Sequence, residues 1–353
     1  MLYLSIGENC MAGKMLRRFE ISNTWSTPYT WARSNISYAI ECEEQKYNNL
    51  LNVNYIVKDD KSPFPESWRN TSFVNQQGPF EHSVSNGFEF AHHDVIDNAE
   101  HKSSYERKTQ RMLELRDTDE DIVFFYHHRY VDNDNIDFVI SECERFLQFY
   151  ASDHHKRSLV IITQSIVSDY TMRRIEVTQE KSCVVARFYT TRVWAGSEEG
   201  MVAGELDDDL FVEMFKELKT LNVLDDIDFL KDYKCSPVYY LNDCNSLIEE
   251  RIKKLLNDKI DNLYIWGSNG FGYALANYLL SRGIRVTAFI DDKPEKQGNT
   301  YKELPTLAYL KDIRNPNIIL AIKKKKSMFK ILNQIEVGAN VITYEELFGD
   351  LIS

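Results

Sequence analysis

The chain has 353 residues, of which 43% are hydrophobic, 27% charged and 12% aromatic, so its composition excludes a disordered chain. Forty-two Lys and Arg residues against 54 Asp and Glu residues give a formal net charge of -12, which argues against nucleic acid as a partner. Because domains usually span about 100 to 200 residues, the length predicts two domains.

The sequence shows no sign of membrane insertion or of a disulfide framework. No apolar run approaches the roughly 20 residues that a membrane-spanning helix needs. The opening segment 1–10 lacks the basic region of a signal peptide. The six cysteines are scattered and form no Cys-x-x-Cys pair, which argues against a structural zinc site. We therefore expect a cytoplasmic protein with free thiols, no transmembrane segment and no metal, and the sequence leaves its oligomeric state open.

Strands and helices alternate through residues 1–240. Between them, the stretch 48–98 is rich in Asn, Ser, Pro and aromatic residues and has little helical periodicity, and such long irregular stretches are often functional. The pattern predicts one mixed α/β domain over this range. The predicted elements are strands at 2–6, 122–126, 159–163 and 183–189, and helices at 10–19, 105–115, 136–150 and 207–221.

The last third of the chain follows a more regular βαβ pattern. It predicts a small, Rossmann-like, mostly parallel sheet over residues 260–353, and a helical linker at 241–259 joins it to the first domain. The expected strands are 262–266, 284–290, 318–322 and 340–343. The expected helices are 273–280, a short one that opens at 307–310, and 327–335.

The clearest chemical feature of the first domain is a cysteine in a turn between strand and helix. Gly7 permits the sharp turn, and Cys10 then lies in the first turn of the helix. The N-terminus of a helix stabilises a thiolate, and its unpaired N–H groups would stabilise an oxyanion. We therefore predict that Cys10 is a nucleophile, while the alternative is a small buried packing residue. We interpret the other five cysteines as packing residues.

A thiolate nucleophile needs a base, and two His-His pairs are candidates. His93 is followed by Asp94, a carboxylate that would orient the imidazole, so we predict His93 as the base. His127 and His128 follow an apolar strand, at the edge where α/β sheets place their sites. The sequence alone does not decide which histidine meets Cys10. Neighbouring residues of a strand point to opposite sides, which argues against a metal site in these pairs.

The first domain resembles a bacterial family of unknown function that is classed with the papain-like cysteine peptidases. The resemblance rests on Leu4-Ser-Ile-Gly-Glu-Asn-Cys10, Thr27-Pro-Tyr-Thr-Trp31 and His93-Asp94, and it covers roughly residues 1–165. It implies a papain-like or related fold with a Cys/His site. Thr30 stands where the family often has Asp, so an acidic role at that position is not implied.

A glycine-rich turn opens the predicted C-terminal domain. Glycines let a phosphate approach the backbone at a helix N-terminus, and a carboxylate about 20 residues later would accept ribose hydroxyls. The motif has the spacing G-x-x-G-x-G. It predicts a nucleotide or nucleotide-sugar site, and the alternative is a Rossmann-like fold retained for structure or interaction. The candidate ligand residues are Gly267, Ser268, Asn269, Gly270, Gly272, Asp291 and Asp292.

The segment over about residues 260–348 resembles the N-terminal nucleotide-sugar-binding domain of bacterial sugar acetyltransferases. The resemblance rests on the glycine-rich turn, on Phe289-Ile-Asp-Asp292 and on the later Leu304-Pro305. It implies ligands like UDP-sugars more than NAD.

Together these features predict a cysteine-dependent transferase or hydrolase of bacterial surface-polysaccharide biosynthesis. Cys10, His93 and Asp94 would act on an activated carbohydrate or acyl group, with a nucleotide sugar or glycan as substrate and with no required cofactor. One alternative is a glycosyltransferase or another nucleotide-sugar-modifying transferase in which Cys10 is structural. The other is a non-catalytic scaffold that senses a ligand.

Overall fold

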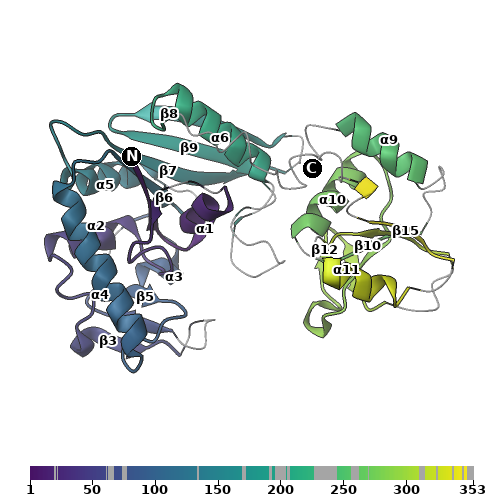
Figure 1. The fold of residues 1–353 in the computed structure, drawn as a ribbon, viewed down its shortest axis with the longest axis horizontal. Coiled ribbons are helices and arrows are strands. Elements are labelled where there is room, and N and C mark those ends of the chain that lie inside the picture. Colours follow the sequence, from purple (N-terminus) through teal and green to yellow (C-terminus); the bar gives the residue numbers. More distant parts are fainter. Residues whose placement is uncertain are drawn as a thin grey trace. The chain divides into compact units, whose positions relative to one another are not determined.

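The chain divides into two compact units in a computed structural model (Figure 1). The N-terminal unit comprises Met1–Val193 and Val212–Tyr233, and the C-terminal unit comprises Trp194–Phe211 and Lys234–Ser353. The structure describes residues 1–19, 21, 23–60, 62, 67–73, 78–132, 135–168, 172–190, 193–194, 204, 207–225, 245–255, 262–268, 270–309, 315–322, 325–335, 338–343 and 346–347.

A six-stranded sheet forms the centre of the N-terminal unit. All neighbouring strands are parallel except the last pair, which is antiparallel. Numbered along the chain, the five parallel strands lie in the order 2-1-3-4-5, which is the flavodoxin-like order. Across the sheet the strands are β2 (Thr24–Trp25), β1 (Leu2–Gly7), β6 (Ile122–His127), β7 (Arg157–Ile166), β9 (Cys183–Thr190) and β8 (Arg174–Glu180).

Helices cover both faces of this sheet. Alternate residues of a strand point to opposite faces, and both faces of β1 and β6 are buried, as a parallel sheet requires. Figure 1 shows α1 beside β6, with α6 along the sheet. The helices are α1 (Met11–Arg18), α2 (Ile36–Glu44), α3 (His82–Ser85), α4 (Ala99–Glu114), α5 (Ile136–Gln148) and α6 (Asp208–Thr220), with 3-10 turns at Val53–Tyr55 and Leu115–Asp117.

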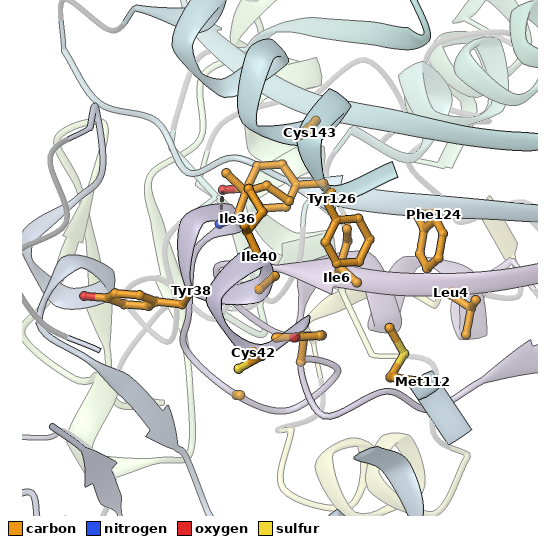
Figure 2. Close-up of a cluster of buried hydrophobic side chains, with 14 of the residues drawn as sticks. Leu4, Ile6, Ile36, Tyr38, Ile40, Cys42, Met112, Phe124, Tyr126 and Cys143 are labelled. Atoms are coloured by element: carbon orange, nitrogen blue, oxygen red, sulfur yellow. Dashed lines mark hydrogen bonds between the residues drawn. The ribbon is translucent and has the colours of Figure 1, made fainter. Parts of the chain in front are cut away.

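One face of β1 and β6 packs into the main apolar core. Figure 2 shows Leu4 and Ile6 of β1 beside Phe124 and Tyr126 of β6, together with residues of α2, α4 and α5. The backbone N–H of Ile36 donates to the Tyr126 hydroxyl at 3.3 Å, which ties the start of α2 to this core. The core therefore fixes the sheet edge at which both strands end.

The stretch 48–98 is more regular than the sequence suggests. It contains a small antiparallel sheet of β3 (Ile56–Lys58), β4 (Trp68–Asn70) and β5 (Phe88–Phe90). Each strand has three residues, which is too short for the alternation of apolar and polar residues to be visible in the sequence.

The C-terminal unit is built around a second six-stranded sheet. Its five parallel strands, numbered along the chain, lie in the order 3-2-1-4-5, which is the order of doubly wound dinucleotide-binding folds. The strands across the sheet are β12 (Thr300–Tyr301), β13 (Leu304–Leu307), β11 (Ala288–Ile290), β10 (Leu263–Trp266), β14 (Asn317–Leu320) and β15 (Asn340–Ile342). The helices are α9 (Asn245–Leu255), α10 (Gly270–Ser281) and α11 (Lys325–Leu332), with a 3-10 turn at Pro294–Lys296. The expected start of a helix at 307 is wrong, because Leu307 pairs with Ile290 as the last residue of β13, and the strand expected over 284–290 is limited to β11.

The α/β fold class with two sheet domains is confirmed. The helix α9 lies inside the predicted linker 241–259, while 241–244 and 256–259 lie outside the described residues. The domain boundaries at 240 and 260 stay a prediction. No helix in the described part of the chain combines the length and the apolar character needed to cross a membrane.

Candidate active site

The carboxyl ends of β1 and β6 adjoin at the point where the strand order reverses. Gly7, the last residue of β1, pairs with His127, the last residue of β6. In open α/β sheets such a reversal leaves a crevice in which ligands bind. The residues that leave the two strands here are 8–10 on one side and 128–129 on the other.

Gly7 is required by the close approach of the two strand ends. Its φ is +143°, a conformation that L side chains rarely adopt. A Cβ atom at this position would lie 3.0 Å from the backbone nitrogen of His127 and 3.2 Å from its carbonyl oxygen. Gly7 therefore allows the segment Glu8–Cys10 to leave β1 directly beside the end of β6.

Glu8 is a fully buried carboxylate that joins both strand ends. Its Oε1 accepts hydrogen bonds from the Tyr126 hydroxyl at 2.5 Å and from Nδ1 of His128 at 2.8 Å. Its Oε2 accepts from the backbone N–H of Arg129 at 2.9 Å. Glu8 and His128 are both 0% exposed. A buried carboxylate needs such donors, so Glu8 holds the segment after β1 on the segment after β6.

Asn9 orients the imidazole of His127. The Asn9 Oδ1 accepts from the backbone N–H of Met11 at 3.0 Å, and this N–H donor fixes which end of the amide is the oxygen. Nδ1 of His127 lies 2.9 Å from the same Oδ1, so Nδ1 carries the proton. The neutral ring then has its lone pair on Nε2.

The imidazole of His127 is held in its neutral form. Burial lowers the pKa of His127 well below its usual value, and the positive charges of Arg129 and His128 lower it further. Neutral imidazole is the form that accepts a proton, so His127 is in the protonation state of a general base at neutral pH, but its lowered pKa makes it a weaker base than a free imidazole.

Cys10 directly follows the residue that holds His127, and it is the N-cap of α1. Among the described cysteines, Cys10 alone is partly exposed, since Cys42, Cys143 and Cys183 are buried. Cys235 and Cys244 lie outside the described residues. The side chain of Cys10 makes no capping hydrogen bond to the first turn of α1. The position therefore combines access from solvent with the N-terminus of a helix.

The predicted base, His93, lies in another local environment. Its Nδ1 is 2.9 Å from the carbonyl oxygen of Ala91, and its ring packs edge-on against His101 and Tyr105. Burial lowers the pKa of His93 to about 4, and Lys108 and His101 add to this effect.

The predicted orienting acid, Asp94, is occupied by backbone donors. Its Oδ1 accepts from the N–H groups of Ile96 at 2.9 Å and of Asp97 at 2.8 Å. Among the described residues, no hydrogen bond joins His93 to Asp94 or to Cys10. The structure thus brings Asn9, the residue before Cys10, together with His127, whereas roles for Cys10, His93 and Asp94 stay a prediction.

The glycine-rich turn of the C-terminal unit is held by an acidic residue. The Asp291 Oδ2 accepts from the backbone N–H of Ser268 at 3.0 Å and from its hydroxyl at 2.8 Å, and Lys296 Nζ lies 3.4 Å from the same oxygen. The other oxygen accepts from the N–H of Lys293. Asp291 therefore shapes the turn itself, whereas the predicted partner Asp292 is exposed.

The three glycines of this turn lie where the motif predicts them. Gly267 follows β10 with a φ of +117°, and Gly270 begins α10. A Cβ on Gly272 would lie 2.0 Å from the carbonyl oxygen of Gly267, so the helix and the turn are in close contact here. The predicted ligand residue Asn269 lies outside the described residues.

Comparisons with known proteins give one family match, in the N-terminal unit. Residues 1–165 match a family described as "Putative papain-like cysteine peptidase (DUF1796)". The comparison with curated proteins finds no match. A solved structure described as "Crystal structure of RSP in complex with beta-NADH" shares 16% identity over 39% of this chain and 84% of its own, with a TM-score of 0.22. The resemblance of residues 260–348 to a sugar acetyltransferase domain is not confirmed.

Proposed function

We propose that the N-terminal unit is a cysteine-dependent hydrolase or acyl transferase with Cys10 as its nucleophile and His127 as its base. The observation that carries this proposal is the hydrogen bond of 2.9 Å between Asn9 and His127, directly beside Cys10 at the helix N-terminus. Asn9 would be a positioning residue. Cysteine, histidine and asparagine are also the residue types that act together in papain-like proteases. The family match of residues 1–165 supports the hydrolase half of the proposal.

The proposed step is acyl transfer to sulfur. The thiol proton of Cys10 passes to Nε2 of His127 while the sulfur bonds to the substrate carbonyl carbon, and the carbonyl electron pair moves to oxygen. The backbone N–H groups of Ala12 and Gly13, in the first turn of α1, would stabilise this oxyanion, because the N–H of Met11 already donates to Asn9.

The tetrahedral intermediate then collapses to an acyl-enzyme as the carbonyl group re-forms. The carbon–leaving-group bond breaks, and the leaving group takes the proton from His127, which leaves a thioester on Cys10. Water completes a hydrolysis, and an acceptor hydroxyl or amine completes a transfer.

An activated ester tests the thioester directly. We expect p-nitrophenyl acetate to release nitrophenolate in a burst with the wild type, and peptide mass spectrometry to find the acetyl group on Cys10. The Cys10→Ala variant should lose the burst, and the matched variant Cys143→Ala, which removes a buried thiol, should keep it. An equal burst from Cys10→Ala would overturn the proposal.

The C-terminal unit is proposed to bind a nucleotide or a nucleotide sugar. Its strand order and the glycine turn after β10 favour this function over a purely structural role. Because the Asp291 carboxylate already accepts a hydrogen bond from Ser268, the exposed Asp292 would be the acid that contacts the ribose hydroxyls. We expect UDP-glucose to bind in a calorimetric titration and Asp292→Asn to weaken it by about tenfold. No heat change with UDP-glucose, GDP-mannose or NADH would contradict this assignment.

If the C-terminal unit binds a nucleotide sugar, we propose that this activated carbohydrate is a substrate of the acyl transfer or hydrolysis at Cys10, in polysaccharide biosynthesis. This part of the proposal depends on the resemblance of residues 260–348 and on nucleotide-sugar binding. A glycosyl transfer that survives in Cys10→Ala would instead favour a transferase in which Cys10 is structural. Ligand binding without any turnover would favour the sensing scaffold.

A further inference from the structure

Helix α4 carries a lysine on its buried face. Residues three and four positions apart lie on one face of a helix, so Tyr105, Lys108 and Met112 form one stripe. Tyr105 and Met112 belong to the apolar core, and Lys108 is only 8% exposed. An ammonium group removed from water is costly unless a partner compensates it. Packing alone does not explain a lysine at this position.

The ammonium group of Lys108 has no acceptor among the residues that the structure describes. Its Nζ lies 4.5 Å from the centroid of the Tyr105 ring, and no hydrogen bond or ion pair to it is present in that part of the chain. The Tyr105 hydroxyl is also buried without a described partner. Burial lowers the pKa of Lys108 to about 8, and the charges of Arg111, Arg17 and Arg107 lower it further. Among the described residues, the charges that shift this pKa are therefore all positive.

Two of these arginines stack on tryptophans. The guanidinium of Arg17 lies 4.8 Å from the ring centroid of Trp31, and that of Arg111 lies 5.3 Å from that of Trp25, which is 40% exposed. Both arginines reach Ser26, at 3.5 Å from its hydroxyl and 3.0 Å from its carbonyl oxygen. Within the described residues neither forms an ion pair, although the chain carries 54 acidic residues.

We propose that Arg17, Lys108 and Arg111 bind the phosphoryl group of a small ligand. A phosphate monoester carries nearly two negative charges and three strong acceptor oxygens, so it matches three cationic donors better than a single carboxylate does. The Tyr105 hydroxyl supplies a further donor. The aromatic faces of Trp25 and Trp31 keep the two guanidinium groups in place.

The cluster of Arg17, Lys108 and Arg111 lies within reach of Cys10, because Arg17 is on helix α1, which begins directly after Cys10. Arg17 lies seven residues after Cys10, which corresponds to about 10 Å along the helix. A phosphorylated substrate of moderate size would thus reach both. The inference nevertheless stands without the thiol chemistry, because phosphate binding requires no turnover and is measurable in Cys10→Ala.

Thermal unfolding of the full chain tests the site with inorganic phosphate, compared with chloride at equal ionic strength. Phosphate should raise the Tm of the wild type, and it should leave Lys108→Met and Arg111→Gln unaffected. The matched control is Lys102→Met, on the same helix, which should respond like the wild type. Glucose 1-phosphate is the second arm, and tighter binding than inorganic phosphate identifies a phosphorylated ligand, whereas equal binding identifies free phosphate.

Two further readouts separate this site from a structural lysine. In chloride, Lys108→Met should unfold at or above the wild-type Tm, because it removes a buried charge without an acceptor. Calorimetry at pH 9 in two buffers of different ionisation enthalpy should show proton uptake on phosphate binding, since a bound anion raises the pKa of Lys108. A phosphate response that persists in Lys108→Met, or a wild type that does not distinguish phosphate from chloride, would overturn the proposal.

Discussion

Replacing Glu8 by alanine is expected to lower the free energy of unfolding by about 3 kcal/mol or more, because three buried donors lose their acceptor at about 1 to 3 kcal/mol each. The carboxylate is fully buried and accepts from the Tyr126 hydroxyl, Nδ1 of His128 and the N–H of Arg129. Alanine would remove the carboxylate that accepts from all three donors. Urea unfolding monitored by circular dichroism measures the loss.

Two matched variants separate the lost acceptor from the lost side chain. Glu8→Gln keeps one oxygen acceptor and the volume, so it should cost clearly less than Glu8→Ala. Glu176 makes an ion pair with Arg174 on the exposed strand β8, and Glu176→Ala should change stability little. If Glu8→Ala unfolds at the same urea concentration as Glu176→Ala, Glu8 does not hold the two strand ends together.

Replacing Gly272 by alanine is expected to destabilise the C-terminal unit by about 3 kcal/mol or more, in the upper range for overpacking. The new Cβ would lie 2.0 Å from the carbonyl oxygen of Gly267, a backbone atom that a rotamer change does not move. Either α10 or the turn after β10 must shift. Hydrogen exchange followed by mass spectrometry should show faster exchange in β10 and β14, and unchanged exchange in β1 and β6.

Gly283→Ala is the matched control for this clash. Gly283 has a φ of +71°, but a Cβ there would meet nothing within 4 Å. Its substitution should therefore cost only the left-handed backbone conformation, about 1 to 2 kcal/mol. Equal effects of the two substitutions would mean that the close contact of α10 with the turn is not what Gly272 provides.

The local features of the candidate site were predictable from the sequence. The strand, glycine turn and helix around Gly7 and Cys10 follow from an apolar run, a glycine and an amphipathic segment, and the structure has them within a residue or two. The glycines of the second turn were predictable for the same reason. In both turns, the placement of the glycines between an apolar strand and a helix is enough to predict the local structure.

The partners across the sheet were not predictable. Asn9 and His127 are 118 residues apart in sequence, and only the strand order that places β1 beside β6 brings them together. No local pattern encodes that order. The Glu-Asn pair between Gly7 and Cys10 was a possible signal, because two polar residues at a buried strand end need partners. Likewise, Lys108 occupies a position of the buried stripe of α4 at which an apolar residue is expected.

The dependence of Cys10 alkylation on His127 tests the central claim most directly. Iodoacetamide labelling at neutral pH, mapped by peptide mass spectrometry, gives the rate for Cys10 in the wild type, His127→Gln, Asn9→Ala and His93→Gln. We expect His127→Gln to slow labelling of Cys10 by about tenfold or more and Asn9→Ala to slow it less, since Asn9 acts through the imidazole. His93→Gln should keep the wild-type rate. A slower rate in His93→Gln, with His127→Gln unchanged, would contradict this account and assign the base to His93.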